Sequence, residues 1–260
     1  MNIQLPHVPE RPIKPRNEGL TMMMDKGLSV QETANFIESS GEFTDYVKFG
    51  FGTAMITNKL SEKLKLYKQA NIRPYFGGTL FEAFIIRNMF DDYRKLIDKY
   101  ELDLLEVSDG SMSLPHDQKL EFIQKLSARA TVLSEVGSKQ RGVVIPADKW
   151  VQMMKSELEA GAFKVIAEAR ESGTIGIYNS DGSPDENLIS NIASQIKPSD
   201  VLWEAPEGKQ QAWFIKLYGA NVNLGNIATN GVIPLECLRL GLRGDTFFDF
   251  LPEKYFIHKQ

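Results

Sequence analysis

The sequence predicts an α/β protein built as a single (β/α)8 barrel, the fold known as the TIM barrel. Short apolar, strand-like runs alternate with amphipathic helical patterns about eight times over about 240 residues, which matches such a barrel in element count and length. An open doubly wound sheet is the alternative, and it usually has fewer strands and a glycine-rich turn that opens its first helix. No G-x-G-x-x-G pattern follows the first strand candidate, which favours the barrel.

The strand candidates are apolar runs bounded by glycine, proline or charged residues. In chain order they are Gly19–Met24, Tyr46–Phe49, Arg73–Phe76, Leu104–Ser108, Ala130–Leu133, Lys164–Glu168, Val201–Glu204 and Ala220–Leu224. Their nearly continuous apolar character is typical of parallel strands that are buried on both faces.

The intervening segments carry apolar residues at helical spacing. Helices are expected at about Ser29–Ser40, Leu60–Tyr67, Leu80–Met89, Asp91–Tyr100, from Ser113 onward, Pro146–Ala160, Glu186–Gln195, Gln210–Tyr218 and from Pro234 onward. Ser29 with Glu32 has the spacing of a capping box. Ser113 is expected to cap the helix that holds Pro115 in its first turn, where proline is tolerated.

Residues 1–18 lie outside this alternation. Met1–Arg16 contains four prolines and scattered charges, so we expect residues 1–18 to form an extended arm and residues 19–260 to form the barrel domain. No linker or shift in composition divides the remainder of the chain.

Composition narrows the class of function. The chain has 260 residues, is 42% apolar and 25% charged, and carries a net charge of −4. This charge argues against nucleic acid or a membrane surface as the main partner. The single cysteine, Cys237, excludes an internal disulfide and a cysteine-rich zinc site. Without an apolar run of about 20 residues or a signal-peptide core, we expect a cytoplasmic protein.

Ionisable residues stand within or just after the predicted strands, whose carboxyl ends meet at one mouth of a barrel. They include Lys26, Lys48, Glu106, Asp109, Glu135, Lys139, Glu168 and Glu204. The amide of Asn223 stands at a similar position after the last predicted strand. A charged residue after a strand is commonly a solvated loop residue. Charges inside buried strands are costly, however, unless they pair or bind a metal. The set therefore indicates an active site.

Four glutamates with no histidine among them suit a hard cation such as Mg²⁺. Glu106, Glu135 and Glu168 are the first candidate ligands, with Asp109 and Glu204 as alternates. The three histidines lie in the arm, at a helix start and in the tail. Proton transfer would therefore fall to a lysine.

Anion-binding features follow other strands. Gly77, Gly78 and Thr79 offer backbone N–H groups, and Arg170 and Arg243 offer guanidinium forks, which are common receivers of phosphate and carboxylate. Glycine pairs are also ordinary turn residues, so this signal is weak by itself. Together with the glutamates, these residues predict a Mg²⁺-dependent barrel enzyme that acts on a small phosphorylated acid.

The motifs resemble those of the phosphosulfolactate synthase family, in family order over residues 19–247. The matching strings are DKGL (25–28), DYVKFGFGT (45–53), GGTLFE (77–82), EVSDGS (106–111), SEVGSK (134–139), EARESG (168–173), WEAP (203–206), VNLGNIA (222–228) and LRLGLRGDT (238–246). Each string is short, but the ordered set is specific.

The resemblance implies a carbon–sulfur lyase that adds sulfite to phosphoenolpyruvate with Mg²⁺ and forms (2R)-3-phosphosulfolactate, an intermediate in one route to coenzyme M. It also implies a lysine general acid at the position of Lys139. Lys26 and Lys48 are then expected to offset repulsion between the two anionic substrates. Arg170 and Arg243, with Gly77–Thr79 and Asn223, are expected to hold the substrate.

The chain departs from the family pattern at Ala169, where the family commonly has glycine, and at Ser138, where it commonly has a second lysine. Two alternatives stay open: another barrel lyase or aldolase on a phosphorylated enol or keto acid, and a non-catalytic, heat-stress-associated homologue. Aromatic residues in the tail indicate an interface of a homo-oligomer. They are Phe247, Phe248, Phe250, Tyr255 and Phe256.

Overall fold

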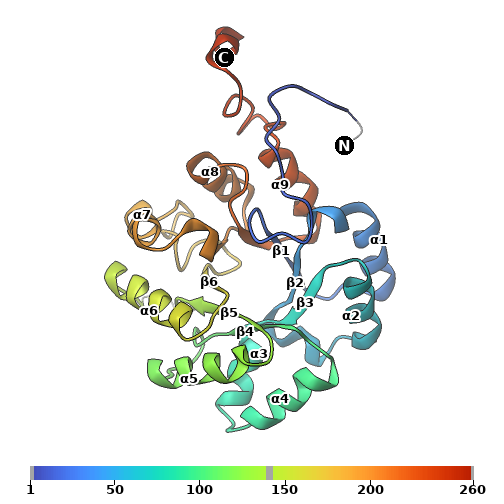
Figure 1. The fold of residues 1–260 in the computed structure, drawn as a ribbon, viewed down its shortest axis with the longest axis vertical. Coiled ribbons are helices and arrows are strands. Elements are labelled where there is room, and N and C mark those ends of the chain that lie inside the picture. Colours follow the sequence, from blue (N-terminus) through green and yellow to red (C-terminus); the bar gives the residue numbers. More distant parts are fainter. Residues whose placement is uncertain (1–2, 139–142, 259–260) are drawn as a thin grey trace.

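The computed structural model describes residues 3–138 and 143–258. Eight strands in this part of the chain form one parallel sheet that is rolled into a nearly closed barrel (Figure 1). Its strands are β1 (Thr21–Asp25), β2 (Tyr46–Phe49), β3 (Arg73–Phe76), β4 (Leu104–Val107), β5 (Thr131–Val136), β6 (Lys164–Ala167), β7 (Val201–Glu204) and β8 (Leu224–Ile227). The eight strands follow the order β3-β2-β1-β8-β7-β6-β5-β4. The predicted (β/α)8 barrel is confirmed.

Helices surround the strands (Figure 1). They are α1 (Val30–Ser40), α2 (Leu60–Gln69), α3 (Gly78–Ile85), α4 (Phe90–Lys99), α5 (His116–Ser127), α6 (Ala147–Glu159), α7 (Glu186–Gln195), α8 (Gly208–Tyr218) and α9 (Val232–Arg239). The capping box of Ser29 and Glu32 is confirmed. The expected cap at Ser113 is wrong, because Pro115 has an extended ψ of 131° and helix α5 begins after it.

The eighth strand also differs from its prediction at Ala220–Leu224. Leu224 is its first residue rather than its last. Asn223 lies just before it, where its Nδ2 donates to the carbonyls of Ser199 and Val201, and its Oδ1 accepts from the N–H of Leu20. The side chain of Asn223 therefore connects three main-chain segments at the amino end of the barrel.

The barrel interior is filled by its own apolar layer, distinct from the layer between strands and helices. This layer consists of Leu20, Met22, Tyr46, Tyr75, Leu104, Leu133, Ile166 and Leu202. Side chains alternate along a strand, so the residue two positions after a member of the layer also points inward. In this way Leu133 is followed by Glu135, and Leu202 by Glu204, at the carboxyl ends of their strands.

The sheet has one seam. Among the described strands, β3 and β4 are neighbours without a hydrogen-bonded register. Side chains bridge them instead. Near the amino ends, Arg73 donates to the carbonyl of Asp103 at 2.8 Å and to Thr131 Oγ1 at 2.9 Å. Near the carboxyl ends, the N–H of Gly78 donates to Glu106 Oε1 at 2.5 Å.

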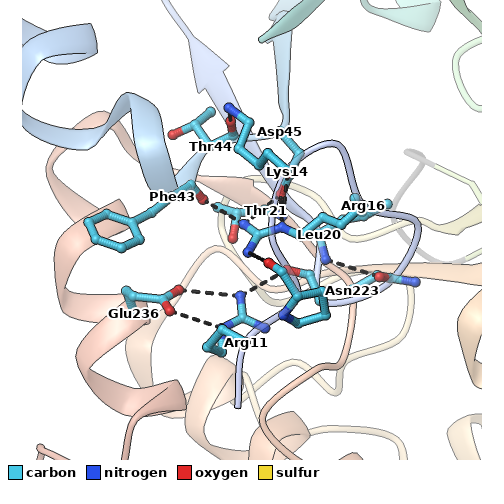
Figure 2. Close-up of polar contacts among 12 residues, drawn as sticks. Arg11, Lys14, Arg16, Leu20, Thr21, Phe43, Thr44, Asp45, Asn223 and Glu236 are labelled. Carbon is cyan, nitrogen blue, oxygen red and sulfur yellow. Dashed lines mark hydrogen bonds and ion pairs between the residues drawn. The ribbon is translucent and has the colours of Figure 1, made fainter. Parts of the chain in front are cut away.

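Residues 3–18, the described part of the predicted arm, contain no helix or strand. Figure 2 shows that this segment is tied down by its basic side chains. Arg11 pairs with Glu236 of α9 at 2.9 Å, and Arg16 pairs with Asp45 at 2.9 Å. Asp45 also accepts from the N–H of Thr21 at 2.8 Å. The segment therefore links helix α9 to the start of β2 at the amino end of the barrel.

The tail after α9 extends away from the barrel in Figure 1. Its aromatic rings contact one another, as in the pairs Phe247–Phe248 and Phe248–Phe256, while Phe247 stays 47% exposed. The expected homo-oligomer remains a prediction. None of the helices in the described residues is long and apolar enough to cross a membrane.

Candidate active site

A cavity of about 450 Å³ lies at the carboxyl ends of the strands. This volume is within the range that suits a small ligand. The cavity is lined by Met24, Lys48, Gly50, Phe51, Gly77, Thr79, Ser111, Glu135, Glu168, Ala169, Arg170, Glu171, Ser172, Thr174, Ile175, Glu204 and Asn226. Seven of the fourteen site residues predicted from the sequence line this cavity: Lys48, Gly77, Thr79, Glu135, Glu168, Arg170 and Glu204.

Three glutamates form the acidic floor of this cavity: Glu135, Glu168 and Glu204. One carboxylate oxygen from each lies within 4.8 Å of the others. All three are at most 2% exposed. Glu135 lies in β5, Glu168 directly follows β6 and Glu204 ends β7. These are three successive strands of the sheet, so the barrel itself fixes the spacing of the glutamates.

Lys48 of β2 reaches across the interior toward this floor. Its Nζ lies 3.0 Å from Glu135 Oε2, 3.2 Å from Glu204 Oε1 and 3.0 Å from Glu106 Oε2. Burial alone would lower the pKa of Lys48, but the three carboxylates outweigh it and hold the pKa well above its usual range. Lys48 therefore pairs as a cation with the carboxylates of Glu106, Glu135 and Glu204.

Crowding of carboxylates also changes Glu204. Burial, with the nearby carboxylates of Glu135 and Glu106, raises the pKa of Glu204 to about 7, although Lys48 opposes this effect. Glu204 Oε2 accepts from the N–H of Ala169 at 2.8 Å, which orients the carboxylate. The floor is thus a place where another cation would be favoured electrostatically.

Glu106 has a different position from the other candidate ligands. One oxygen contacts Lys48 and the other accepts the N–H of Gly78 across the β3–β4 seam. Gly78 fits here because a Cβ atom at this position would lie 2.1 Å from Ser108 Oγ. Glu82 of α3 reinforces the seam, since its carboxylate accepts from the hydroxyl of Ser108 and from the N–H of Ser111.

The rim of the cavity, opposite the acidic floor, carries groups that are suited to binding an anion. Arg170 is exposed and follows β6, and no acidic side chain in the described ranges forms an ion pair with it. The hydroxyls of Thr79, Ser111 and Thr174 line the same cavity. Lys26 also lies at the rim, where it forms an exposed ion pair with Glu171.

Lys26, Gly78 and Glu106 do not line the cavity themselves, although each lies beside a residue that does. Three further predicted residues have their partners elsewhere. Asp109 pairs with Lys119 of α5 at 2.9 Å, Arg243 pairs with Asp245 at 3.3 Å on the surface, and Asn223 lies at the amino end of the barrel. The expectation that Asn223 faces the substrate depended on the misplaced eighth strand. Lys139 falls outside the described residues.

Sequence reasoning did not single out Phe51, Ser111, Thr174 and Ile175 as site residues. Thr174 and Ile175 reach the cavity because the chain after β6 folds back on itself through a bridge between Ala169 and Gly176. The length of the polar segment between β6 and α7 is the signal that points to such a loop, since long loops in compact domains are often functional.

The acidic floor fits Mg²⁺ by the chemistry of its donors. Three buried carboxylates converge without a histidine or cysteine among them, and hard oxygen donors are the ligands that Mg²⁺ prefers. Glu135, Glu168 and Glu204 are the residues that would hold the ion. Of the alternates named from the sequence, Glu204 belongs to this group and Asp109 does not.

The fold and the cavity define a (β/α)8-barrel protein with a carboxylate-rich site at the carboxyl ends of its strands. The family model described as (2R)-phospho-3-sulfolactate synthase (ComA) matches residues 9–245. The chain belongs to this family.

Two relatives named phosphosulfolactate synthase support the assignment. The protein from Bacillus subtilis is 38% identical over 93% of this chain and 97% of its own length. The protein from Methanothermobacter thermautotrophicus is 36% identical over 92% of this chain and 95% of its own. These similarities indicate that the chain is an enzyme.

More distant similarities are less specific. A protein of Arabidopsis thaliana named HEAT-STRESS-ASSOCIATED 32 is 24% identical over 95% of both chains. Among solved structures, 3-hexulose-6-phosphate synthase from Salmonella typhimurium matches with a TM-score of 0.52 at 13% identity, covering 86% of this chain and all of that one. The latter match supports the barrel fold alone.

Proposed function

We propose that this enzyme is a carbon–sulfur lyase that joins sulfite to phosphoenolpyruvate in a Mg²⁺-dependent reaction and forms (2R)-3-phosphosulfolactate. The sulfur of sulfite bonds to the methylene carbon, and a proton adds to the neighbouring carbon that carries the carboxylate and the phosphate. The observation that carries this proposal is the convergence of Glu135, Glu168 and Glu204 on one point of the barrel floor.

Phosphoenolpyruvate has two anionic ends, and the cavity offers two different places for them. Its carboxylate suits the floor, because the reaction builds negative charge on that group and a bound Mg²⁺ would supply Lewis-acid stabilisation. Its phosphate suits the rim, where Arg170 and the hydroxyls of Thr79 and Ser111 line the cavity. Arginine is well suited to this task because its planar fork binds phosphate through two parallel hydrogen bonds.

Lys48 serves the floor in this proposal. Its ammonium group lies within 3.2 Å of three carboxylates, so it balances their charge and keeps their side chains extended toward the cavity. This role replaces the expected one, in which Lys48 offsets repulsion between the substrates. The ion pair of Lys26 with Glu171 likewise directs that lysine to the rim loop.

The proton donor in the proposal is Lys139, on the strength of the family resemblance at Ser134–Lys139. The segment leaves the barrel after β5, where Gly137 has a φ of 140° that favours glycine. The chain thus turns directly after Glu135 and Val136. Arg243, which pairs with Asp245 on the surface, is assigned no role in substrate binding.

The test is to incubate the purified protein with phosphoenolpyruvate and Mg²⁺, with and without sulfite. Consumption of phosphoenolpyruvate only with sulfite supports the synthase. Consumption with another nucleophile would indicate a different barrel lyase, and binding without turnover would indicate a non-catalytic homologue. The Lys139→Ala variant is expected to bind phosphoenolpyruvate but to lose turnover; near-normal turnover would exclude Lys139 as the proton donor.

A further inference from the structure

Lys119 is a buried cation that the proposed chemistry does not use. It lies in the first turn of α5, outside the barrel wall, and its side chain is 0% exposed. It does not line the cavity. A fully buried ammonium group is costly unless each of its donors has a partner, so its contacts indicate what it does for the fold.

Three oxygen atoms surround Lys119 Nζ. They are Asp109 Oδ1 at 2.9 Å, the main-chain carbonyl of Glu135 at 2.6 Å and Glu157 Oε1 at 2.9 Å. Lys119 donates hydrogen bonds to the first two of these oxygens, and it forms a buried ion pair with Glu157. One of these acceptors belongs to a residue of the acidic floor.

The carbonyl of Glu135 accepts from Lys119 because β4 is too short to offer it a main-chain N–H group. On the opposite side of β5, the carbonyl of Val136 accepts from the N–H of Glu168 at 3.0 Å. Successive carbonyls of a strand point to opposite sides, so the carbonyl of Glu135 faces β4. Since β4 ends at Val107, Lys119 takes the place of a strand amide there.

Glu157 holds Lys119 from the other side. It lies in the last turns of α6, and its side chain is 0% exposed. Lys119 thereby connects α5, α6, the end of β5 and the loop that contains Asp109. A buried pair of this kind fixes geometry, because removing either partner leaves a buried charge without compensation.

We propose that Lys119 and Glu157 are a positioning pair that fixes the main chain at Glu135 and so aims its carboxylate at Glu168 and Glu204. This inference rests on the proposed function, in which those carboxylates hold Mg²⁺. The role of Asp109 follows from it: Asp109 anchors the loop after β4 through Lys119 and is not a metal ligand.

Metal affinity is the first readout, since partners that orient metal ligands typically contribute about 10–100-fold in affinity. Mn²⁺ alone is titrated into the full-length protein and followed by electron paramagnetic resonance. Lys119→Met and the charge-balanced double variant Lys119→Met/Glu157→Gln are each expected to raise the Kd at least about tenfold. The double variant guards against misfolding, because it removes the fully buried carboxylate of Glu157 together with its cation and leaves only Asp109, whose side chain is 14% exposed.

Two controls separate positioning from general destabilisation. Lys125→Met removes an exposed lysine of the same helix, which is 57% exposed and pairs with Glu121. Ile123→Val loosens the packing of the buried face of that helix, where Ile123 is 0% exposed. The side chain of Ile123 has no polar group that could bind a floor residue. The Kd of both control variants for Mn²⁺ should lie within about twofold of that of the unmodified protein, because the two substitutions leave the partners of Glu135 in place.

Hydrogen exchange of the metal-free protein is the second readout. Peptides that cover β5 should exchange at least about tenfold faster in both Lys119 variants, while peptides that cover β1 should keep their rate. A folded double variant with unchanged Mn²⁺ affinity and unchanged β5 exchange would overturn the positioning role. If the unmodified protein binds no Mn²⁺, the metal in the proposed function is wrong, and the exchange rates alone decide the role of Lys119.

Discussion

The N–H of Gly78 donates to the carboxylate of Glu106 across the seam between β3 and β4, at 2.5 Å. These two residues stand where the otherwise continuous ladder of the barrel is interrupted. The contact explains both sequence signals at once: the glycine is required for a close approach, and the glutamate is required as the acceptor that replaces a strand partner.

Gly78→Ala should therefore destabilise the protein. The added methyl group would lie 2.1 Å from Ser108 Oγ and 2.9 Å from Glu106 Oε1, and overpacking of this kind costs about 1–3 kcal/mol. Urea unfolding measures the loss. Gly244→Ala is the matched control, because no atom lies within 4 Å of its added Cβ; an equal effect of the two substitutions would contradict the seam interpretation.

Arg16→Ala tests the attachment of residues 3–18 to the barrel. Arg16 and Asp45 have side chains that are each 5% exposed, so removal of the arginine leaves a buried carboxylate unpaired. Breaking such a pair costs about 3–5 kcal/mol. Lys59→Ala, which breaks an exposed pair with Glu62, should cost at most about 1 kcal/mol. A loss below 1 kcal/mol for Arg16→Ala would mean that this segment contributes little to the barrel.

Glu168→Gln tests the composition of the acidic floor. The substitution keeps the size of the side chain but removes one of three converging carboxylates, so we expect Mg²⁺ affinity to fall at least about tenfold by calorimetry. Glu121→Gln changes a carboxylate that is 63% exposed on α5 and should leave the affinity unchanged. Equal affinity in both variants would place the metal elsewhere.

Lys48→Met tests whether the ammonium group stabilises the floor before any metal binds. Without it, Glu106, Glu135 and Glu204 lose the cation that lies within 3.2 Å of each. The metal-free variant should melt at a lower temperature than the unmodified protein, and saturating Mg²⁺ should raise its Tm by more, because a dication relieves the added repulsion. A Mg²⁺-induced shift no larger than that of the unmodified protein would exclude this role.

Most of the fold could be predicted from the sequence, because parallel strands that are buried on both faces appear as apolar runs. A shared site could also be predicted for four residues that stand in or directly after such runs, namely Lys48, Glu135, Glu168 and Glu204. The eighth strand was misplaced because the apolar residues Ala220 and Val222 are buried for another reason. They lie at the amino end of the barrel, where Arg239 donates to their carbonyls.

The roles of individual charges were harder to predict, because they depend on partners far away in the sequence. Asp109 follows a strand just as a metal ligand would, yet its partner is Lys119 on the outer side of the wall. Asp25 ends β1 but points outward, where Lys63 of α2 lies 2.7 Å away. The one-residue alternation of a strand decides which side of the barrel a charge faces, and an error of one position reverses it.

The most direct test of the proposed function is to identify the product made from phosphoenolpyruvate and sulfite. Phosphorus-31 nuclear magnetic resonance and mass spectrometry would follow the reaction at fixed protein concentration, with Mg²⁺ or with a chelator. Phosphosulfolactate is expected to accumulate at a rate that rises with sulfite and falls to background with the chelator. Phosphoenolpyruvate that stays intact in the presence of sulfite and Mg²⁺, or that is consumed equally without sulfite, would contradict the proposed function.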